Sequence, residues 1–211
     1  MNEPADQVRP QRGQEASRIA MGVVGMGSPF DRNDLQTIAR DGAADSWGWA
    51  LVEELSDLPS HVTVRNARHP LDLLDWIEDF DSLHIVDSLQ WSDRSSCDLL
   101  EPRNKSPAST ISQPSWNDDH FRLWKWDVKE IELQMQFKSD SHSLGLVEVL
   151  SIAKSMGWTP AGVTLWGVEV LPCRDSSSNI VSTDDREAVQ KSLKRMGEWM
   201  QSVMMRESLP D

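Results

Sequence analysis

Residues 82–87, SLHIVD, form a short apolar run that ends on a carboxylate, and this run decides the fold class together with similar runs around it. An apolar run of this length is typical of a buried strand. A carboxylate at the end of such a strand is costly unless it is paired or bound to a metal, so Asp87 is a candidate functional residue. A hydrogen-bonded turn or a helix cap explains Asp87 equally well at this stage.

Strand patterns and helix patterns alternate on both sides of this run. Further strands are expected near residues 19–26, 61–66, 121–127 and 162–170, and helices near 45–55, 70–77, 143–153 and 182–203. The β-α-β-α-β-β-α-β-α order predicts a three-layer α/β/α sandwich with a mainly parallel central sheet. Ligands of such sheets bind outside the carboxyl ends of the strands.

The length of 211 residues suits one domain with a full hydrophobic core. Residues 1–17 are polar and rich in charge, which predicts a disordered N-terminal tail. Residues 18–211 are then expected to form a single domain. Its polar stretches at 31–44 and 90–120 are predicted to be insertions.

Charge and composition exclude several classes of function. The net charge of -13 leaves no basic stripe for phosphates, so we expect no nucleic-acid partner. No apolar run reaches the length of about 18 residues that a membrane span needs. Cys97 and Cys173 lie far apart and show no metal-binding spacing, which fits free thiols in a reduced cytoplasmic compartment.

Two further residues could act together with Asp87. Asp45 precedes a helical pattern, and His142 lies in a serine-rich stretch just before another. An ordinary role is open to each, because Asp45 can cap its helix and His142 can cap or face solvent. If the three converge, two carboxylates and one imidazole make an open site for a borderline divalent metal.

Four segments resemble the hydrogenase maturation endopeptidases, which trim the C-terminus of the nickel-containing hydrogenase large subunit. VVGMGSP (23–29) is similar to the family's opening strand with its Gly-x-Gly-Asn-Pro loop, and DSWGWALVEEL (45–55) is similar to its acidic residue and following helix. LHIVDS (83–88) is similar to its strand ending in Val-Asp-Ala. SHSLGL (141–146), followed by VTLWGVE (163–169), is similar to its histidine loop and last strand.

The resemblance implies a cytoplasmic α/β/α endopeptidase, expected as a monomer, that forms a transient complex with the hydrogenase large-subunit precursor. Asp45, Asp87 and His142 are implied as metal ligands. They would hold nickel that the client protein supplies, so no resident cofactor is needed. The resemblance assigns no catalytic residue, and either metal-bound water or a nearby carboxylate could attack the peptide bond.

The chain also departs from the family pattern. Ser28 replaces the family's asparagine, and Asn66 stands where an aspartate is usual. The 31–44 insertion makes the first ligand ambiguous, since an ungapped match points to Asp34. Asp45 is preferred because the helix that follows it matches the family helix.

These departures leave a second hypothesis open, a degenerate homologue that acts as a protein- or metal-binding module without cleaving. A third reading is an unrelated nucleotide-binding domain. The missing third glycine, with Phe at position 30, and the lack of a P-loop lysine count against that reading.

Overall fold

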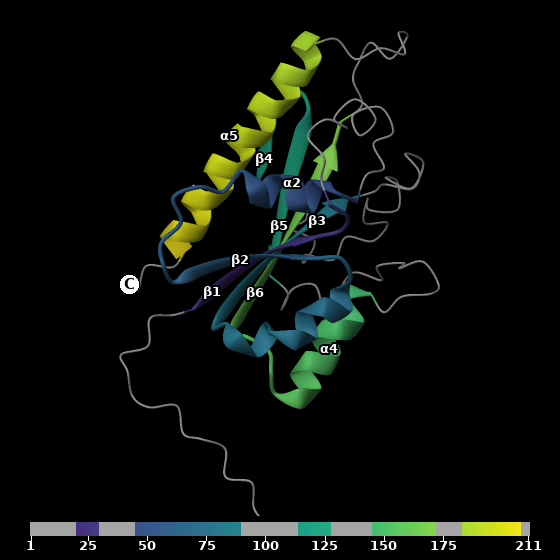
Figure 1. Ribbon diagram of the computed structural model, residues 1–211, viewed down its shortest axis with the longest axis vertical. Coiled ribbons are helices and arrows are strands. Elements are labelled where there is room, and N and C mark those ends of the chain that lie inside the picture. Colours follow the sequence, from purple (N-terminus) through teal and green to yellow (C-terminus); the bar gives the residue numbers. More distant parts are fainter. Residues whose placement is uncertain (1–19, 30–44, 90–113, 128–144, 172–182, 208–211) are drawn as a thin grey trace, which may run out of the picture.

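A computed structural model describes residues 20–29, 45–89, 114–127, 145–171 and 183–207 as a six-stranded sheet with helices on both faces (Figure 1). The strands lie in the order β2-β1-β3-β6-β5-β4. Their bounds are β1 Met21–Met26, β2 Val62–Ala67, β3 Ser82–Leu89, β4 Trp116–Asn117, β5 Phe121–Asp127 and β6 Gly162–Val170. Strands β2, β1, β3 and β6 run parallel, while β5 is antiparallel to β6 and β4 to β5. The predicted α/β/α sandwich with a mainly parallel sheet is confirmed.

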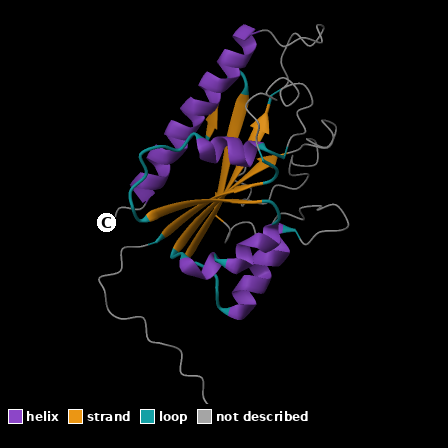
Figure 2. Cartoon of the chain, viewed as in Figure 1, coloured by secondary structure: helices purple, strands orange, loops and turns teal. Residues whose placement is uncertain are grey.

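The helical elements form the two outer layers (Figures 1 and 2). One face carries α2 (Trp47–Glu53) and α5 (Thr183–Glu207), and the other carries η2 (Pro70–Asp75), η3 (Ile77–Asp79) and α4 (Leu146–Met156). Strand β1 is buried along its whole length because its two faces pack against the two helical layers. Met21 and Val23 pack into the core on the α2 and α5 side, and Val24 and Met26 into the core on the α4 side.

Several predicted boundaries differ from the observed ones. The helix expected at 70–77 is instead two short 3₁₀ turns, because Trp76 between them adopts a φ of -153° that no helix continues through. Helix α4 starts at Leu146, a few residues after the predicted start, since its N-cap Gly145 is still extended. Strand β4 lies within the predicted 90–120 insertion, and its two residues are too few to show an alternating pattern.

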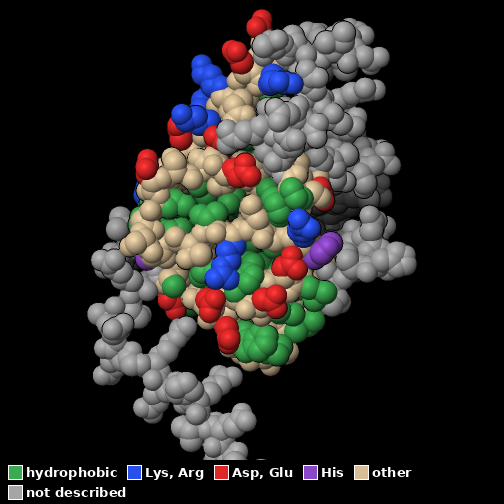
Figure 3. Space-filling model, in the orientation of Figure 1, with side chains coloured by type: hydrophobic (Ala, Val, Ile, Leu, Met, Phe, Trp, Pro, Cys, Tyr) green, Lys and Arg blue, Asp and Glu red, His purple; other side chains and the backbone are tan. Residues whose placement is uncertain are grey.

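Parts of the predicted organisation lie outside the described residues, namely the tail at 1–17, the insertion at 31–44 and most of the 90–120 segment. Among the helices that the structure describes, none has the length and apolar character needed to cross a bilayer. On the face drawn in Figure 3, Lys and Arg side chains of the described residues are interspersed with Asp and Glu.

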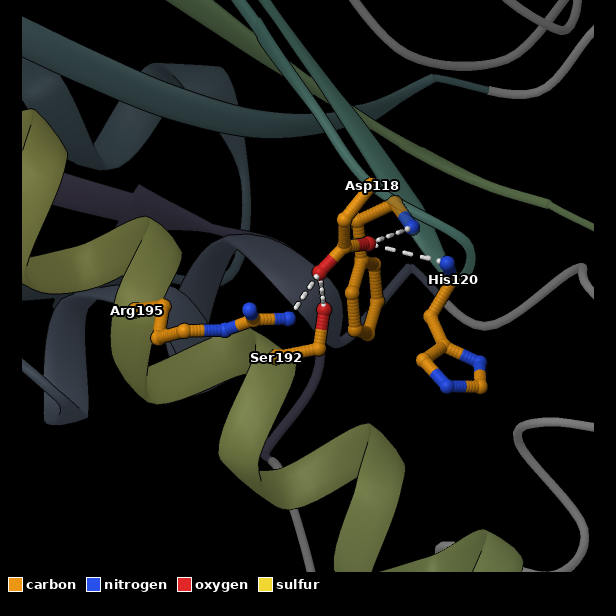
Figure 4. A network of polar contacts seen from close by, with 5 residues as sticks. Asp118, His120, Ser192 and Arg195 are labelled. Atoms are coloured by element: carbon orange, nitrogen blue, oxygen red, sulfur yellow. Dashed lines mark hydrogen bonds and ion pairs between the residues drawn. The ribbon is translucent and has the colours of Figure 1, made fainter.

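The turn between β4 and β5 is tied to α5 through one carboxylate (Figure 4). Asp118 Oδ1 accepts hydrogen bonds from the backbone N–H groups of His120 and Phe121, both at 2.9 Å. Its Oδ2 accepts from Ser192 Oγ and pairs with Arg195 at 3.0 Å. Desolvation raises the pKa of Asp118, but these hydrogen bonds and the Arg195 charge outweigh it and lower the pKa overall.

We therefore expect Asp118→Ala to destabilise the protein by about 2 to 4 kcal/mol, because the buried Ser192 hydroxyl and two backbone donors lose their acceptor. Urea unfolding measures this loss. The exposed neighbour Asp119 provides the control, since Asp119→Ala should change stability by no more than about 0.5 kcal/mol. Equal effects of the two substitutions would contradict the role assigned to Asp118.

Candidate functional site

The sheet has a topological switch point between β1 and β3. From β1 the chain crosses to the edge strand β2, and it then returns to β3 on the other side of β1. In doubly wound sheets, ligands bind at the carboxyl ends of the strands at such a point, where the crossing connections diverge. The end of β1 and the second half of β3 therefore mark the place to look for a site.

Asp45 is held against the end of β1. Gly27, directly after the strand, has a φ of +115°, and a Cβ there would lie 1.6 Å from the Asp45 carbonyl oxygen. The Gly27 N–H donates to the Ala67 carbonyl at 3.0 Å, which anchors this loop to β2. Ser28 Oγ then donates to Asp45 Oδ2 at 2.9 Å. The exposed Asp45 carboxylate is thus fixed by the first loop of the fold.

The expectation that Asp45 caps the helix is wrong. Ser46 occupies the N-cap position of α2, but no side-chain capping hydrogen bond is present there. The Asp45 carboxylate binds Ser28 instead. The ordinary structural explanation offered for Asp45 from the sequence therefore does not apply.

Asp87 lies inside β3 and does not end it, because the strand continues to Leu89. Its partner across the sheet is Gly167 of β6. Side chains alternate along a strand, so Asp87 shares the α4 face with Ile85, which packs into the core on that side. Its Oδ1 accepts a hydrogen bond from the Ser88 N–H at 2.7 Å.

Electrostatics link the two carboxylates. Desolvation by burial raises the pKa of Asp87 to about 6, the Ser88 hydrogen bond opposes this rise, and the negative charge of Asp45 adds to it. Asp45 at the end of β1 and Asp87 in β3 therefore lie in the same part of the sheet, and the charge of one acts on the other. A bound cation would relieve both the repulsion and the cost of desolvation.

Helix α2 reaches this position because a glycine lets it approach the sheet closely. A Cβ on Gly48 would lie 2.5 Å from the carbonyl oxygens of both Met26 and Val86, on the two strands that flank the switch point. The Trp47 N–H donates to Ser88 Oγ at 3.2 Å. The first turn of α2 is thus bonded to β3. Asp45 lies two residues before this turn.

The third predicted ligand, His142, lies outside the described residues, as does Asp34, the alternative for the first ligand. Helix α4, which follows His142 in sequence, packs on the same face of the sheet as Asp87. Within the described ranges, no group of three His, Cys, Asp or Glu side chains could hold a metal ion. The metal-ligand set therefore remains a prediction, and the structure describes two of its members, Asp45 at the end of β1 and Asp87 in β3.

Ser88 is a site residue that the sequence reasoning missed. A serine after a strand carboxylate is visible in the sequence, but nothing there indicates that its N–H would bind Asp87 and its hydroxyl would bind α2. Ser46 also contributes to the local polarity, since its buried hydroxyl has no hydrogen-bond partner among the described residues.

His84, in contrast, belongs to the core. It lies on the opposite face of β3 from Asp87, and its Nδ1 accepts a hydrogen bond from Trp166 Nε1 at 3.1 Å. Desolvation by burial lowers its pKa to about 4, with Glu207 opposing the shift and Lys125 reinforcing it. This histidine is therefore neutral and structural.

No known family model matches the chain, and no curated protein matches it either. Solved structures do match. The hydrogenase maturating endopeptidase HybD from E. coli superposes with a TM-score of 0.50 at 19% identity, covering 90% of this chain and 94% of that one. A [NiFe] hydrogenase maturation protease, HycI from Thermococcus kodakarensis KOD1, has a TM-score of 0.49 at 14% identity and covers 89% and 93%. The similarity to HybD shows a shared fold.

Proposed function

We propose that the protein is an endopeptidase that removes the C-terminal extension of a nickel-containing hydrogenase large-subunit precursor. One observation carries the proposal. Asp45 is held against the end of β1 and Asp87 lies in β3, so both carboxylates are at the switch point of a sheet that shares the fold of the endopeptidase HybD. The four sequence segments that resemble the maturation endopeptidases include both residues.

In this proposal, Asp45, Asp87 and His142 hold the nickel that arrives with the precursor. Two carboxylates and an imidazole suit a borderline divalent ion, and three protein ligands leave positions for the client's own groups. The repulsion between Asp45 and Asp87 supports a cation at this place. Nickel is then part of the substrate, and the protein recognises a precursor only after the metal has been inserted.

The partner is accordingly the precursor itself, bound transiently by a cytoplasmic monomer. A polarising metal can activate water toward the scissile carbonyl, and a carboxyl with a pKa near 6 can exchange a proton at neutral pH. Asp87 is suited to this proton exchange. We assign no single nucleophile.

The alternative is a homologue that binds the client or its metal without cutting. Ser28 and Asn66 favour it, because both depart from the family pattern at the edge of the site. The oxygen of the Asn66 side chain would lie 2.8 Å from a Cβ on Gly25, so a neutral amide stands at the end of β2 where the family usually has a carboxylate.

The test is incubation of the purified protein with a nickel-loaded precursor, followed by mass measurement of the large subunit. We expect the wild type to shorten the precursor and His142→Ala to lower the rate at least about 100-fold, since loss of a ligand removes nickel recognition. The thermal unfolding midpoint of His142→Ala should equal that of the wild type.

His61→Ala serves as the matched control and should cleave at the wild-type rate. An intact precursor after incubation with the wild type, with nickel confirmed in it, would support the non-cleaving homologue. Normal cleavage by His142→Ala would remove that residue from the site.

A further inference from the structure

The hydroxyl of Ser28 makes a direct contact with a proposed ligand. Ser28 Oγ donates to Asp45 Oδ2 at 2.9 Å across seventeen positions of sequence. A carboxylate has two oxygens, so a hydrogen bond to Oδ2 leaves Oδ1 fully available to ligate a cation. The contact therefore selects a rotamer of Asp45 as well as holding the residue.

The loop that carries Ser28 is itself fixed. The Gly27 N–H is bonded to the Ala67 carbonyl, and the left-handed φ of Gly27 turns the chain toward Asp45. The hydroxyl is thus presented from a short segment that is bonded to the sheet at the end of β1. A side chain on an unattached loop would lose more conformational entropy in holding Asp45 in one orientation.

The two carboxylates are oriented in different ways. Asp87 is held by a backbone group, the Ser88 N–H, and is partly buried within the sheet. Asp45 is exposed, and the hydrogen bond that orients it comes from a side chain. Mutation can therefore remove the orienting group of Asp45 without touching Asp45 itself.

We propose that Ser28 is a positioning residue for the metal site: its hydroxyl fixes Asp45 so that the second carboxylate oxygen faces the cation, and Ser28 does not bind the cation itself. This inference rests on the proposed metal site and assigns a role to the serine that replaces the family's asparagine. Groups that orient metal ligands typically contribute 10- to 100-fold in affinity.

The experiment is a titration of the purified full-length protein with Ni²⁺ alone, comparing Ser28→Ala, Ser28→Thr and Ser202→Ala. Ser28→Ala is expected to raise the dissociation constant for Ni²⁺ about tenfold, which means weaker binding. Ser28→Thr keeps the hydroxyl and should restore affinity to within about threefold. Ser202, an exposed serine on α5 bonded to the Trp199 carbonyl, is the control and should bind like the wild type.

The outcomes separate this inference from the proposed function. Unchanged affinity in Ser28→Ala overturns it, and so does a failure of Ser28→Thr to restore binding. If Asp45→Asn binds Ni²⁺ as tightly as the wild type does, the inference is overturned too. If Ser28 controls Ni²⁺ affinity but no nickel-loaded precursor is cleaved, the positioning role stands and the endopeptidase proposal fails.

Discussion

Asp87→Asn is expected to make the metal-free protein more stable at pH 7 and, at the same time, unable to cleave a nickel-loaded precursor. The pKa of Asp87 is raised from 3.8 to about 6 in the folded state, chiefly by burial. A carboxyl with a raised pKa holds its proton more tightly when folded, so ionisation costs folding free energy as the pH rises from about 4 to 6. Above about pH 6 the full loss of folding free energy is present. At 1.36 kcal/mol per pKa unit, this loss is up to about 3 kcal/mol.

Asparagine removes this cost because it carries no charge. Its side-chain oxygen can still accept the Ser88 N–H, so the local geometry is kept. Urea unfolding at pH 7 should show a gain of about 1 to 3 kcal/mol. The gain should shrink to about 0.3 kcal/mol near pH 3.5, where the wild-type carboxyl is protonated in the folded state and mostly protonated in the unfolded state. The exposed Asp75 is the control, and Asp75→Asn should change stability by no more than about 0.5 kcal/mol at either pH.

A destabilised Asp87→Asn at pH 7 would mean that the ionised carboxylate is well paired in the metal-free protein. A stabilised variant that still cleaves at the wild-type rate would instead exclude Asp87 from the reaction. The predicted combination, gained stability with lost activity, is typical of a charge kept in place for function.

Sequence patterns predicted the layers of the fold because the strands are long and apolar enough to show them. The run at 82–87 and the fully buried β1 have compositions that fit a parallel sheet covered on both faces. The two residues of β4 carry no such pattern. The 70–77 segment has helical spacing, and only the backbone at Trp76 shows that it forms 3₁₀ turns.

The site was less predictable because its contacts are made by groups without a sequence signature. Asp87 could be chosen from its burial in a strand, and Asp45 from the helix type that follows it. Their mutual repulsion depends on how closely α2 approaches the sheet, and that approach depends on one glycine, Gly48. The Ser28 bond to Asp45 spans the 31–44 segment, across which spacing gave no guide.

Gly27→Ala is expected to destabilise the protein by about 3 to 5 kcal/mol and to abolish Ni²⁺ binding through Asp45. Two costs combine at this position. The φ of +115° is rarely adopted by residues with a side chain, and a Cβ would lie 1.6 Å from the Asp45 carbonyl oxygen. Because that oxygen belongs to the backbone, relief of the overlap must move the segment that carries the carboxylate.

Two other glycines separate these costs. Gly157, after α4, has a φ of +73° with nothing within 4 Å of a Cβ, so Gly157→Ala should cost about 1 kcal/mol from backbone strain alone. Gly162 has open space and no left-handed φ, so Gly162→Ala should change stability by no more than about 0.5 kcal/mol. Both variants should bind Ni²⁺ like the wild type.

The comparison of the three glycines decides whether the end of β1 and Asp45 form one unit. If Gly27→Ala costs no more than Gly157→Ala, backbone strain accounts for the whole effect and the loop can move away from Asp45 freely. If it costs several times more and Ni²⁺ affinity falls with it, the loop cannot yield without displacing the carboxylate. The second result follows from the geometry, because Gly27 comes directly after β1 and its N–H is bonded to the Ala67 carbonyl of β2, so Gly27 cannot move away from Asp45 without breaking that bond.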